Sequence, residues 1–420
     1  MKKALCATTA LVAAGLAAGQ ASADGGIKLG LSGYYRGSAG ILIGGDQVAT
    51  TNGGQGDFQR TSGGFRQEVR INFKGETTLD NGITVSVLVG LNPEGAAANS
   101  SRLNRAYADF SGKYGDVRFG QGSPTDAISQ TCVYDPGNVT ANFGVNSANQ
   151  DFTNAGLSNN GTKGVATFET ADATCVNLSG KGTSVDYFSP SFGGFTFGVS
   201  YTPEGFVSNT SGSQGFGAGT DFKNKMAENV LGVGADYNHD FGGGWTVLVG
   251  GGGQWAFTGH TKGGAPLTGG KPSTYVLGAQ IGIPGGFTVG ASGQYFVNYA
   301  DNPNFAATDA GSGGADGWAG AIGASYTIDA VSIGLEGIYG RYSVFNHGFT
   351  GSGACPSGNC QGHDSIWGVS LNGAYALGPG INLEAQVAYS KYDPDVGTAT
   401  TSNPMSYDAV EIDGGFAINF

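Results

Sequence analysis

The segment Phe65-Arg-Gln-Glu-Val-Arg-Ile-Asn-Phe-Lys-Gly-Glu76 alternates between two kinds of side chain. Successive side chains of a strand point to opposite faces, so this alternation predicts a strand with one apolar and one polar face. The apolar face carries Phe65, Val69, Ile71 and Phe73, and the polar face carries Arg66, Glu68, Arg70, Asn72, Lys74 and Glu76. Asp80-Asn-Gly82 then provides a tight turn, because Asn-Gly tolerates the positive φ that such turns require. The alternation resumes over residues 83–91, which predicts an antiparallel hairpin.

This hairpin is one unit of a pattern that repeats along the chain. Strand patterns of about ten residues, the first over Ile27–Arg36, are joined by short turns and long polar loops in strict alternation. Short turns fall at 80–82, 113–116, 189–194, 242–244, 284–286, 329–330 and 378–380. Long loops fall near 41–64, 92–101, 121–183, 203–227, 258–272, 300–317, 343–363 and 393–406. Seven short turns and eight long loops join sixteen strands.

The strict separation of short and long connections favours a transmembrane β-barrel over a soluble β-sandwich. A sandwich must bring its apolar faces together, whereas lipid covers the apolar face of a membrane barrel and closure leaves no edge strand. Short turns are typical of the periplasmic end and long loops of the outer end. We therefore expect an all-β fold, a single antiparallel barrel of sixteen strands over residues 24–420. A barrel of this size encloses an aqueous channel.

The first residues are typical of an export signal. Lys2-Lys3 precedes the apolar run Ala4–Ala18, and Ala21-Ser-Ala23 is a small-residue cleavage site. The apolar run has about 15 residues, fewer than the roughly 20 that a membrane-spanning helix needs. We expect residues 1–23 to be removed, and loss of the two lysines takes the formal net charge from −12 to −14. Such an acidic protein is a poor partner for nucleic acid.

The loop over residues 121–183 is the longest connection and is acidic. Its charged residues are Asp126, Asp135, Asp151, Glu169 and Asp172 against Lys163 and Lys181. Seven of the chain's eight arginines, in contrast, lie before residue 119. A structureless insert of this length is uncommon in a compact domain unless it has a function. We expect this loop to fold into the mouth of the barrel and to narrow it.

Strand parity directs several arginines toward the barrel interior, namely Arg66, Arg70, Arg105 and Arg118. The loop carboxylates predicted to face them are Asp126, Asp135, Glu169 and Asp172. Charges of opposite sign on opposite elements would create a transverse field across the aperture, which sets the selectivity of a channel. The alternative is that the arginines pair within the wall with Glu68, Glu76 or Asp109. We favour the pore field.

Four cysteines remain after loss of the signal, an even number in a chain bound for an oxidising compartment. Cys132 and Cys175 bracket 44 residues of the long insert, and Cys355 and Cys360 share one outer loop. Disulfides are therefore favoured over metal sites. Other pairings of the four remain open.

The sequence contains no recognisable catalytic arrangement. His239-Asp240 and His363-Asp364 have no nucleophile at a recognisable spacing. The Gly-rich segment 264–272 misses the phosphate-loop spacing and has Pro where Ser or Thr would bind magnesium. We expect neither an enzyme nor a bound cofactor or metal.

Several stretches carry a family resemblance. They are Gly33-Tyr-Tyr-Arg36, Arg105-Ala-Tyr-Ala-Asp-Phe110, Tyr114-Gly-Asp-Val-Arg-Phe-Gly-Gln121, Val185-Asp-Tyr-Phe-Ser-Pro-Ser-Phe-Gly-Gly-Phe-Thr-Phe-Gly-Val-Ser-Tyr-Thr-Pro203 and Val410-Glu-Ile-Asp-Gly-Gly-Phe-Ala-Ile-Asn-Phe420. In this order they resemble the first strand, the fourth, the fifth, the sixth with the seventh, and the closing strand of one family. That family is the general porins of the Gram-negative outer membrane, especially the alphaproteobacterial type.

The resemblance implies a homotrimer in the outer membrane, surrounded by lipid and lipopolysaccharide, that passes ions and small hydrophilic solutes by passive diffusion. It also implies that the loop after the fifth strand folds inward and that the early strands and the last strand form the subunit contact, where Ala106 and Ala108 permit close approach. Phe420 would be the signal read by the barrel assembly machinery. Two alternatives stay open, a substrate-specific channel for sugars or anions and a surface adhesin or structural β-protein that transports nothing.

Overall fold

The fold was analysed in a computed structural model of the chain. It describes residues 26–44, 48–49, 55–56, 63–93, 103–122, 126–144, 175, 178–180, 182–204, 228–258, 271–299, 315–345, 361–393 and 407–420. The predicted signal segment 1–23 and the predicted site residues Glu169, Asp172, Cys355 and Cys360 lie outside these ranges.

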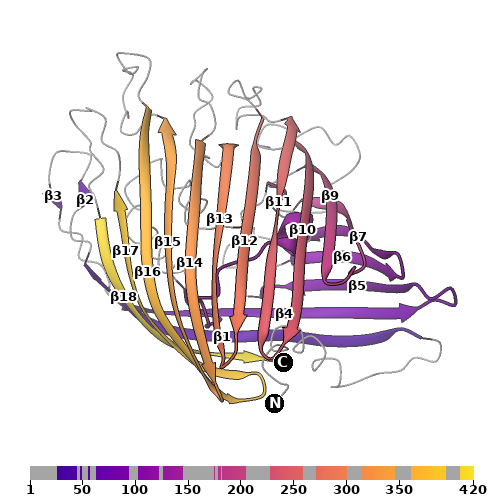
Figure 1. Cartoon of the computed structure of the whole chain (residues 1–420), viewed down its shortest axis with the longest axis horizontal. Coiled ribbons are helices and arrows are strands. Elements are labelled where there is room, and N and C mark those ends of the chain that lie inside the picture. The colour runs from indigo at the N-terminus through magenta and orange to yellow at the C-terminus, as the bar shows by residue number, and fades with distance from the viewer. Residues whose placement is uncertain are drawn as a thin grey trace.

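Sixteen antiparallel strands form one closed barrel, as the turn and loop pattern predicts (Figure 1). They are β1 (Lys28–Gly44), β4 (Gly63–Thr78), β5 (Thr84–Leu91), β6 (Leu103–Gly112), β7 (Gly115–Gly122), β8 (Thr183–Phe188), β9 (Phe195–Glu204), β10 (Glu228–Gly242), β11 (Trp245–Thr258), β12 (Ser273–Ile283), β13 (Phe287–Tyr299), β14 (Ala315–Ile328), β15 (Val331–Phe345), β16 (Gln361–Gly378), β17 (Ile381–Asp393) and β18 (Tyr407–Asn419). Each pairs with the next along the chain, and β1 also pairs with β18. A separate two-stranded sheet joins β2 (Val48–Ala49) and β3 (Gln55–Gly56).

The short connections are tight turns, as their residues predict. In the turn between β4 and β5, Leu79 N donates to Ile83 O over 2.8 Å, and Gly82 has a φ of 82°. That conformation is one that glycine adopts without strain. The turns that join β10 to β11, β12 to β13 and β14 to β15 lie together at the lower ends of these strands in Figure 1.

The two faces of the barrel wall differ in polarity in a sense opposite to that of a soluble protein. On β17, Leu383 and Val387 are exposed, whereas Glu384 and Gln386 between them are only 5% and 3% exposed. The same alternation recurs on the neighbouring strands, where Leu371 is exposed and Asn372 is buried. An apolar outer surface over a polar inner face is typical of a barrel in lipid.

Aromatic side chains gather at two levels of the apolar face. Near the ends that lead into the long loops, Tyr275 and Tyr295 are paired across β12 and β13, and Trp255 Nε1 donates to Tyr275 Oη over 2.9 Å. Near the tight turns, the rings of Phe287 and Tyr326 lie 4.3 Å apart. These two rows fit the interfacial girdles of membrane barrels.

One short helix, α2 (Ala127–Thr131), precedes Cys132. It packs against β9, β10 and β11. Within the described ranges, no helix is long and apolar enough to cross a membrane.

Candidate functional site

The predicted arginines lie on the polar face of the early strands. Arg70 on β4 is paired with Tyr34 on β1, and Arg118 on β7 is paired with Asp109 on β6. Arg105 lies between them on β6 and interacts electrostatically with Arg70 and Arg118. Three of the four predicted arginines are therefore brought together.

A fourth arginine, Arg36, joins this group through Tyr34. The guanidinium carbon of Arg36 lies 4.0 Å from the centre of the Tyr34 ring, and that of Arg70 lies 5.2 Å from it. Glu68 accepts the Tyr34 hydroxyl and forms ion pairs with Arg36 at 3.4 Å and Arg70 at 3.6 Å. The alternation of the first strand puts Arg36 on the polar face, and this was the signal that could have added it to the site. We call Arg36, Arg70, Arg105 and Arg118 the arginine cluster.

The remaining predicted arginine, Arg66, is held by the last strand. Its NH2 group lies 2.8 Å from Glu411 Oε1 and 3.7 Å from Asp413 Oδ1 on β18. Arg118 Nε, in turn, lies 3.5 Å from Asp109 Oδ1. Ion pairs within the wall, the alternative that the sequence left open, are thus present.

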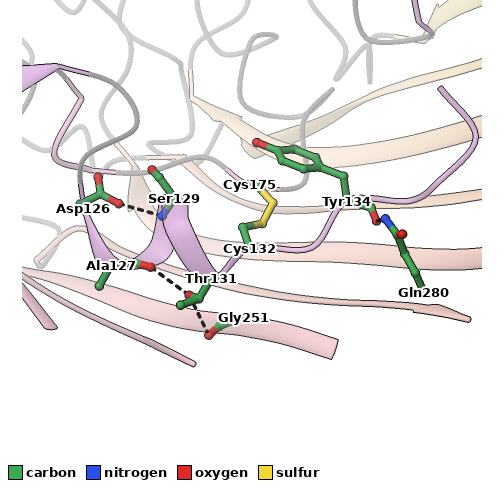
Figure 2. Close-up of a disulfide and its surroundings, with 9 residues drawn as sticks. All are labelled: Asp126, Ala127, Ser129, Thr131, Cys132, Tyr134, Cys175, Gly251 and Gln280. Carbon is green, nitrogen blue, oxygen red and sulfur yellow. Dashed lines mark hydrogen bonds between the residues drawn. A yellow bond between two sulfur atoms is a disulfide. The ribbon is translucent and has the colours of Figure 1, made fainter. Parts of the chain in front are cut away.

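The start of the long loop is fixed by α2 and its capping residue. Asp126 is 2% exposed, and its carboxylate accepts a hydrogen bond of 2.8 Å from Ser129 N at the N-terminus of α2. The same carboxylate accepts the hydroxyl of Ser179 from the returning end of the loop. Thr131 donates to Ala127 O over 2.9 Å and lies 3.5 Å from Gly251 O on β11 (Figure 2). The two hydrogen bonds of Asp126 thus join the start of the loop to its returning end, and the one from Thr131 to Gly251 O holds α2 against β11.

A disulfide joins the two ends of the long loop. Cys132 and Cys175 are bonded, with their Cα atoms 6.2 Å apart (Figure 2). This is the pairing favoured by the sequence. The returning end is also held to β11, because Leu178 N donates to Gln254 Oε1 over 2.6 Å.

After the disulfide the chain runs across further strands. Gln280 Nε2 on β12 donates to Tyr134 O over 2.7 Å. The Tyr134 ring is 57% exposed and points away from Gln280 (Figure 2). Asp135 accepts a hydrogen bond of 3.0 Å from Gly137 N, and burial raises the pKa of this carboxyl above its ordinary value.

Residues 126–144, which we call the wall segment, follow the polar face from β9 to β17. Its apolar side chains Ile128, Val133 and Phe143 are buried. Its last residues form hydrogen bonds to Asn372 on β16 and to Glu384 and Gln386 on β17.

A track of glycines lies directly beneath the wall segment. An added Cβ at each of them would meet an atom of this segment within contact distance: at Gly334, for example, it would overlap Gly137 O. The track comprises Gly234, Gly250, Gly278, Gly290, Gly323 and Gly334, on β10 to β15 in turn. The absence of side chains allows the segment to approach the wall backbone closely.

A sequence profile of the Gram-negative porins matches residues 7–395. The chain belongs to the Gram-negative porin family. No curated protein matches the sequence of this porin.

Solved structures of outer-membrane channels share the fold of this porin. The outer membrane channel DcaP of Acinetobacter baumannii has a TM-score of 0.55 at 14% identity, over 95% of this chain and 99% of that chain. The anion-selective porin from Comamonas acidovorans has a TM-score of 0.53 at 14% identity, over 94% of this chain and all of that chain. OmpT of Vibrio cholerae has a TM-score of 0.53 at 12% identity, over 96% of this chain and all of that chain.

Family and fold together establish the general function. The protein is an outer-membrane channel for the passive diffusion of small solutes. Both point to transport and not to an enzyme.

Proposed function

We propose that this porin is a weakly selective diffusion channel whose aperture lies between the wall segment and the arginine cluster. The observation that carries the proposal is the direction of the wall segment's contacts. They go to polar side chains of the barrel strands, such as the half-buried Gln280 and the buried Asn372 and Glu384.

The polarity of the two faces supports a position inside the barrel. Lipid covers the apolar face of a membrane barrel, so the polar face borders the water-filled interior. A segment seated on the polar face from β9 to β17 would occupy part of that interior. The arc that it leaves uncovered is formed by β1 and β4 to β7, which carry the arginine cluster.

The charges at this aperture would be of both signs. Asp135, with Glu169 and Asp172 elsewhere in the loop, is proposed for the acidic side. Asp126 is engaged in capping α2 and in binding Ser179, which favours a structural role for it. The basic side is the arginine cluster. Cation–π and ion-pair contacts hold the guanidinium groups of Arg36, Arg70 and Arg118 in place. The cluster keeps a net positive charge, because three carboxyl groups stand against four arginines, namely Glu68, Asp109 and Asp186, the last paired with Arg118 across β7 and β8.

Single-channel recording in a planar bilayer under a salt gradient tests this proposal. Replacing Arg66 and Arg70 with Ser should enlarge the conductance and shift the zero-current potential toward cations, because positive charge and bulk leave the wall. Arg341→Ser is the matched control, since Arg341 is an exposed arginine on the apolar face of β15. Unchanged conductance and potential in the double variant would contradict the proposal.

An anion-selective channel is the second candidate, and the arginine cluster is the observation that favours it. The same recording separates the two. A zero-current potential close to zero supports the weakly selective channel, and a strongly anionic one supports the second candidate.

The assembly that we propose is a homotrimer. One of the similar structures, OmpT of Vibrio cholerae, is a trimer form. On this porin, small outward residues such as Ala106 and Ala108 on β6 would let a neighbouring subunit approach closely. We propose that β1, β4 to β6 and β18 form this contact.

Export and insertion complete the proposal. Residues 1–23 would be a cleaved signal, and N-terminal sequencing of the outer-membrane protein should then begin at Asp24. Phe420 would be the assembly signal for the barrel assembly machinery. Its backbone already forms two hydrogen bonds with Gly33, of 2.8 and 3.0 Å.

A further inference from the structure

We propose that Glu384, supported by Asn372 and Gln386, is the anchor that fixes residues 137–144 to the barrel wall and thereby sets the width of the aperture. This inference rests on the proposed role of the wall segment as the constriction. It adds residues of β16 and β17 to the determinants of permeation. From the sequence, these determinants were expected among the arginines and the acidic residues of the long loop.

The Glu384 carboxylate receives three hydrogen bonds from two consecutive residues of the segment. Ala141 N donates to Oε1 over 2.9 Å, and Asn142 donates to Oε2 through its backbone N at 3.0 Å and its side-chain Nδ2 at 2.7 Å. Both carboxylate oxygens are therefore engaged. Hydrogen bonds to an ionised acceptor are roughly twice as strong as neutral ones.

Two neutral side chains extend the anchor on either side of Glu384. Asn372 Oδ1 accepts from Val139 N at 2.9 Å, and its Nδ2 donates to Gly137 O at 3.1 Å. Gln386 Oε1 accepts from Gly144 N at 2.5 Å. The backbone of residues 137–144 is thus held at both ends and in the middle.

The anchored residues form a compact unit of their own. Asn138 Nδ2 donates to Phe143 O over 2.6 Å, and Asn138 Oδ1 accepts from Thr140 N over 2.9 Å. Phe143 itself is buried. A unit that is internally bonded in this way should move as one body when its attachment to the wall is lost.

Burial of Glu384 and attachment of the segment depend on each other. Glu384 is 5% exposed, and its described donors all come from Ala141 and Asn142. A buried carboxylate without donors is strongly unfavourable. The first half of the wall segment has the Cys132–Cys175 disulfide and α2 to hold it, whereas the described hydrogen bonds from residues 137–144 to the barrel go to side chains of β16 and β17 and to Phe416 O on β18.

Hydrogen exchange of the intact porin measures the anchor directly. In Glu384→Ala, the amides of residues 139–144 should exchange roughly tenfold to a hundredfold faster, the factor expected for lost hydrogen bonds to a charged acceptor. Residues 127–131 of α2 should keep their protection. Asn142→Ala removes the side-chain Nδ2 donor from the loop side without changing a strand, so it should accelerate exchange of the same amides even if Glu384→Ala assembles poorly. The control is Asn382→Ala, because Asn382 lies on the polar face of β17 two residues from Glu384 and has no described hydrogen bond to the wall segment.

Exclusion of uncharged polyethylene glycols of graded size measures the aperture independently of charge. Faster exchange together with entry of larger polymers in Glu384→Ala supports the anchor and the constriction. Faster exchange with an unchanged polymer limit supports the anchor but contradicts the proposed constriction. Unchanged exchange of residues 139–144 in both variants would overturn the anchor, whatever the conductance does.

Discussion

At Glu68, two guanidinium groups and one phenol converge on a single carboxylate. Tyr34 donates its hydroxyl to Glu68 and lies between Arg36 and Arg70, so that the aromatic ring and the acid fix both arginines. These ion pairs are partly exposed to solvent, and exposed pairs contribute little to stability, about 0–1 kcal/mol. Their value in a channel is positional, because the carboxylate reduces the positive charge that permeating ions meet.

Replacing Glu68 with Gln should therefore make the channel more anion-selective. The variant keeps the side-chain shape but leaves Arg36 and Arg70 without their counter-charge. A unit charge about 8 Å from an ion in water contributes about 0.5 kcal/mol, which corresponds to a change of about two- to fivefold in the anion-to-cation permeability ratio. The zero-current potential measures this ratio. Glu76→Gln is the control, because Glu76 forms its described ion pair with Lys74, at 2.6 Å, and not with Arg36 or Arg70. An equal shift of the zero-current potential in both variants would exclude a special role for Glu68.

Asp135 should make attachment of the wall segment depend on pH. Burial raises the pKa of this carboxyl above its ordinary value of 3.8, and the hydrogen bond from Gly137 N opposes this only in part. The folded state therefore holds its proton more tightly than the unfolded state, so its contribution to stability is present at low pH and is lost as pH rises through the raised pKa.

Hydrogen exchange of residues 133–138, corrected for the intrinsic pH dependence of exchange, measures this effect. Protection should fall as pH rises from about 3.8 through the raised pKa. Asp135→Asn should give protection that no longer changes over this range. Protection that changes equally with pH in both proteins would assign the effect to another group.

At the scale of elements, the wall segment and the barrel strands are fitted to each other by glycine. The track from Gly234 to Gly334 crosses β10 to β15, and at each position an added Cβ would meet the segment. The segment is tied at one end by a disulfide and at the other by side chains of β16 and β17. The strands from β10 to β17 therefore carry residues that fit the path of the wall segment, glycines where it passes closely and polar side chains where it is bound.

A side chain added to this track should lift the wall segment. In Gly334→Val, the new Cβ would overlap Gly137 O, so residues 135–139 should lose their attachment and exchange at least tenfold faster. Gly337→Val on the same strand is the control. Gly337 faces the apolar side, where an added Cβ would have its nearest neighbour, Val369 Cγ1, at 3.6 Å. If Gly337→Val disturbs the segment as much as Gly334→Val, the track has no specific role.

For the whole molecule, the outward face is uneven around the barrel. The aromatic rows run over β11 to β17, with Tyr275 and Tyr295 at one level and Phe287 and Tyr326 at the other. On β6 the outward positions 106 and 108 carry alanine, and the exposed aromatic residue of this strand, Phe110, lies nearer the tight turn. Large aromatic residues favour the lipid interface, whereas small ones favour close contact between subunits.

Ala108→Trp should therefore disrupt the proposed trimer. A large side chain at a tightly packed contact costs about 1–3 kcal/mol or more at each of its copies, which a trimer contains three times. Light scattering of the protein in mild detergent should show monomers in place of trimers. Ala291→Trp adds the same side chain to the outward face of β13, within the aromatic rows, and should leave the trimer intact. If the trimer survives Ala108→Trp, the subunit contact does not include this part of β6.

Much of the fold follows from the sequence, because its determinants are local. Alternation of two residue classes sets each strand, and turn residues such as Asn81-Gly82 set each hairpin, so the strand number and register direction follow from neighbours in the chain. The same alternation predicts which face of the barrel wall each arginine lies on.

The path of the long loop does not follow in this way. It has no hydrophobic period, and its position is set by partners far along the chain: Ala141 and Glu384 are 243 residues apart. Asp126 shows the consequence. As a charge in an acidic loop it was predicted for the aperture, and its burial and helix-capping bonds could be known only with the loop in place. The alternation of β17 places Glu384 on the polar face, but nothing in the sequence indicates the donors that its carboxylate receives.

The barrel can close during biogenesis only when β18 pairs with β1. Tyr34 pairs with Asn419, and Gly33 bonds with Phe420, so the first strand to emerge finds its second neighbour only when the last strand arrives. Until then both outermost strands expose unpaired backbone groups, which are templates for aggregation and cannot be left in lipid. A prematurely terminated chain would therefore lack closure at any length, and the cell could distinguish finished from unfinished chains by the open seam alone.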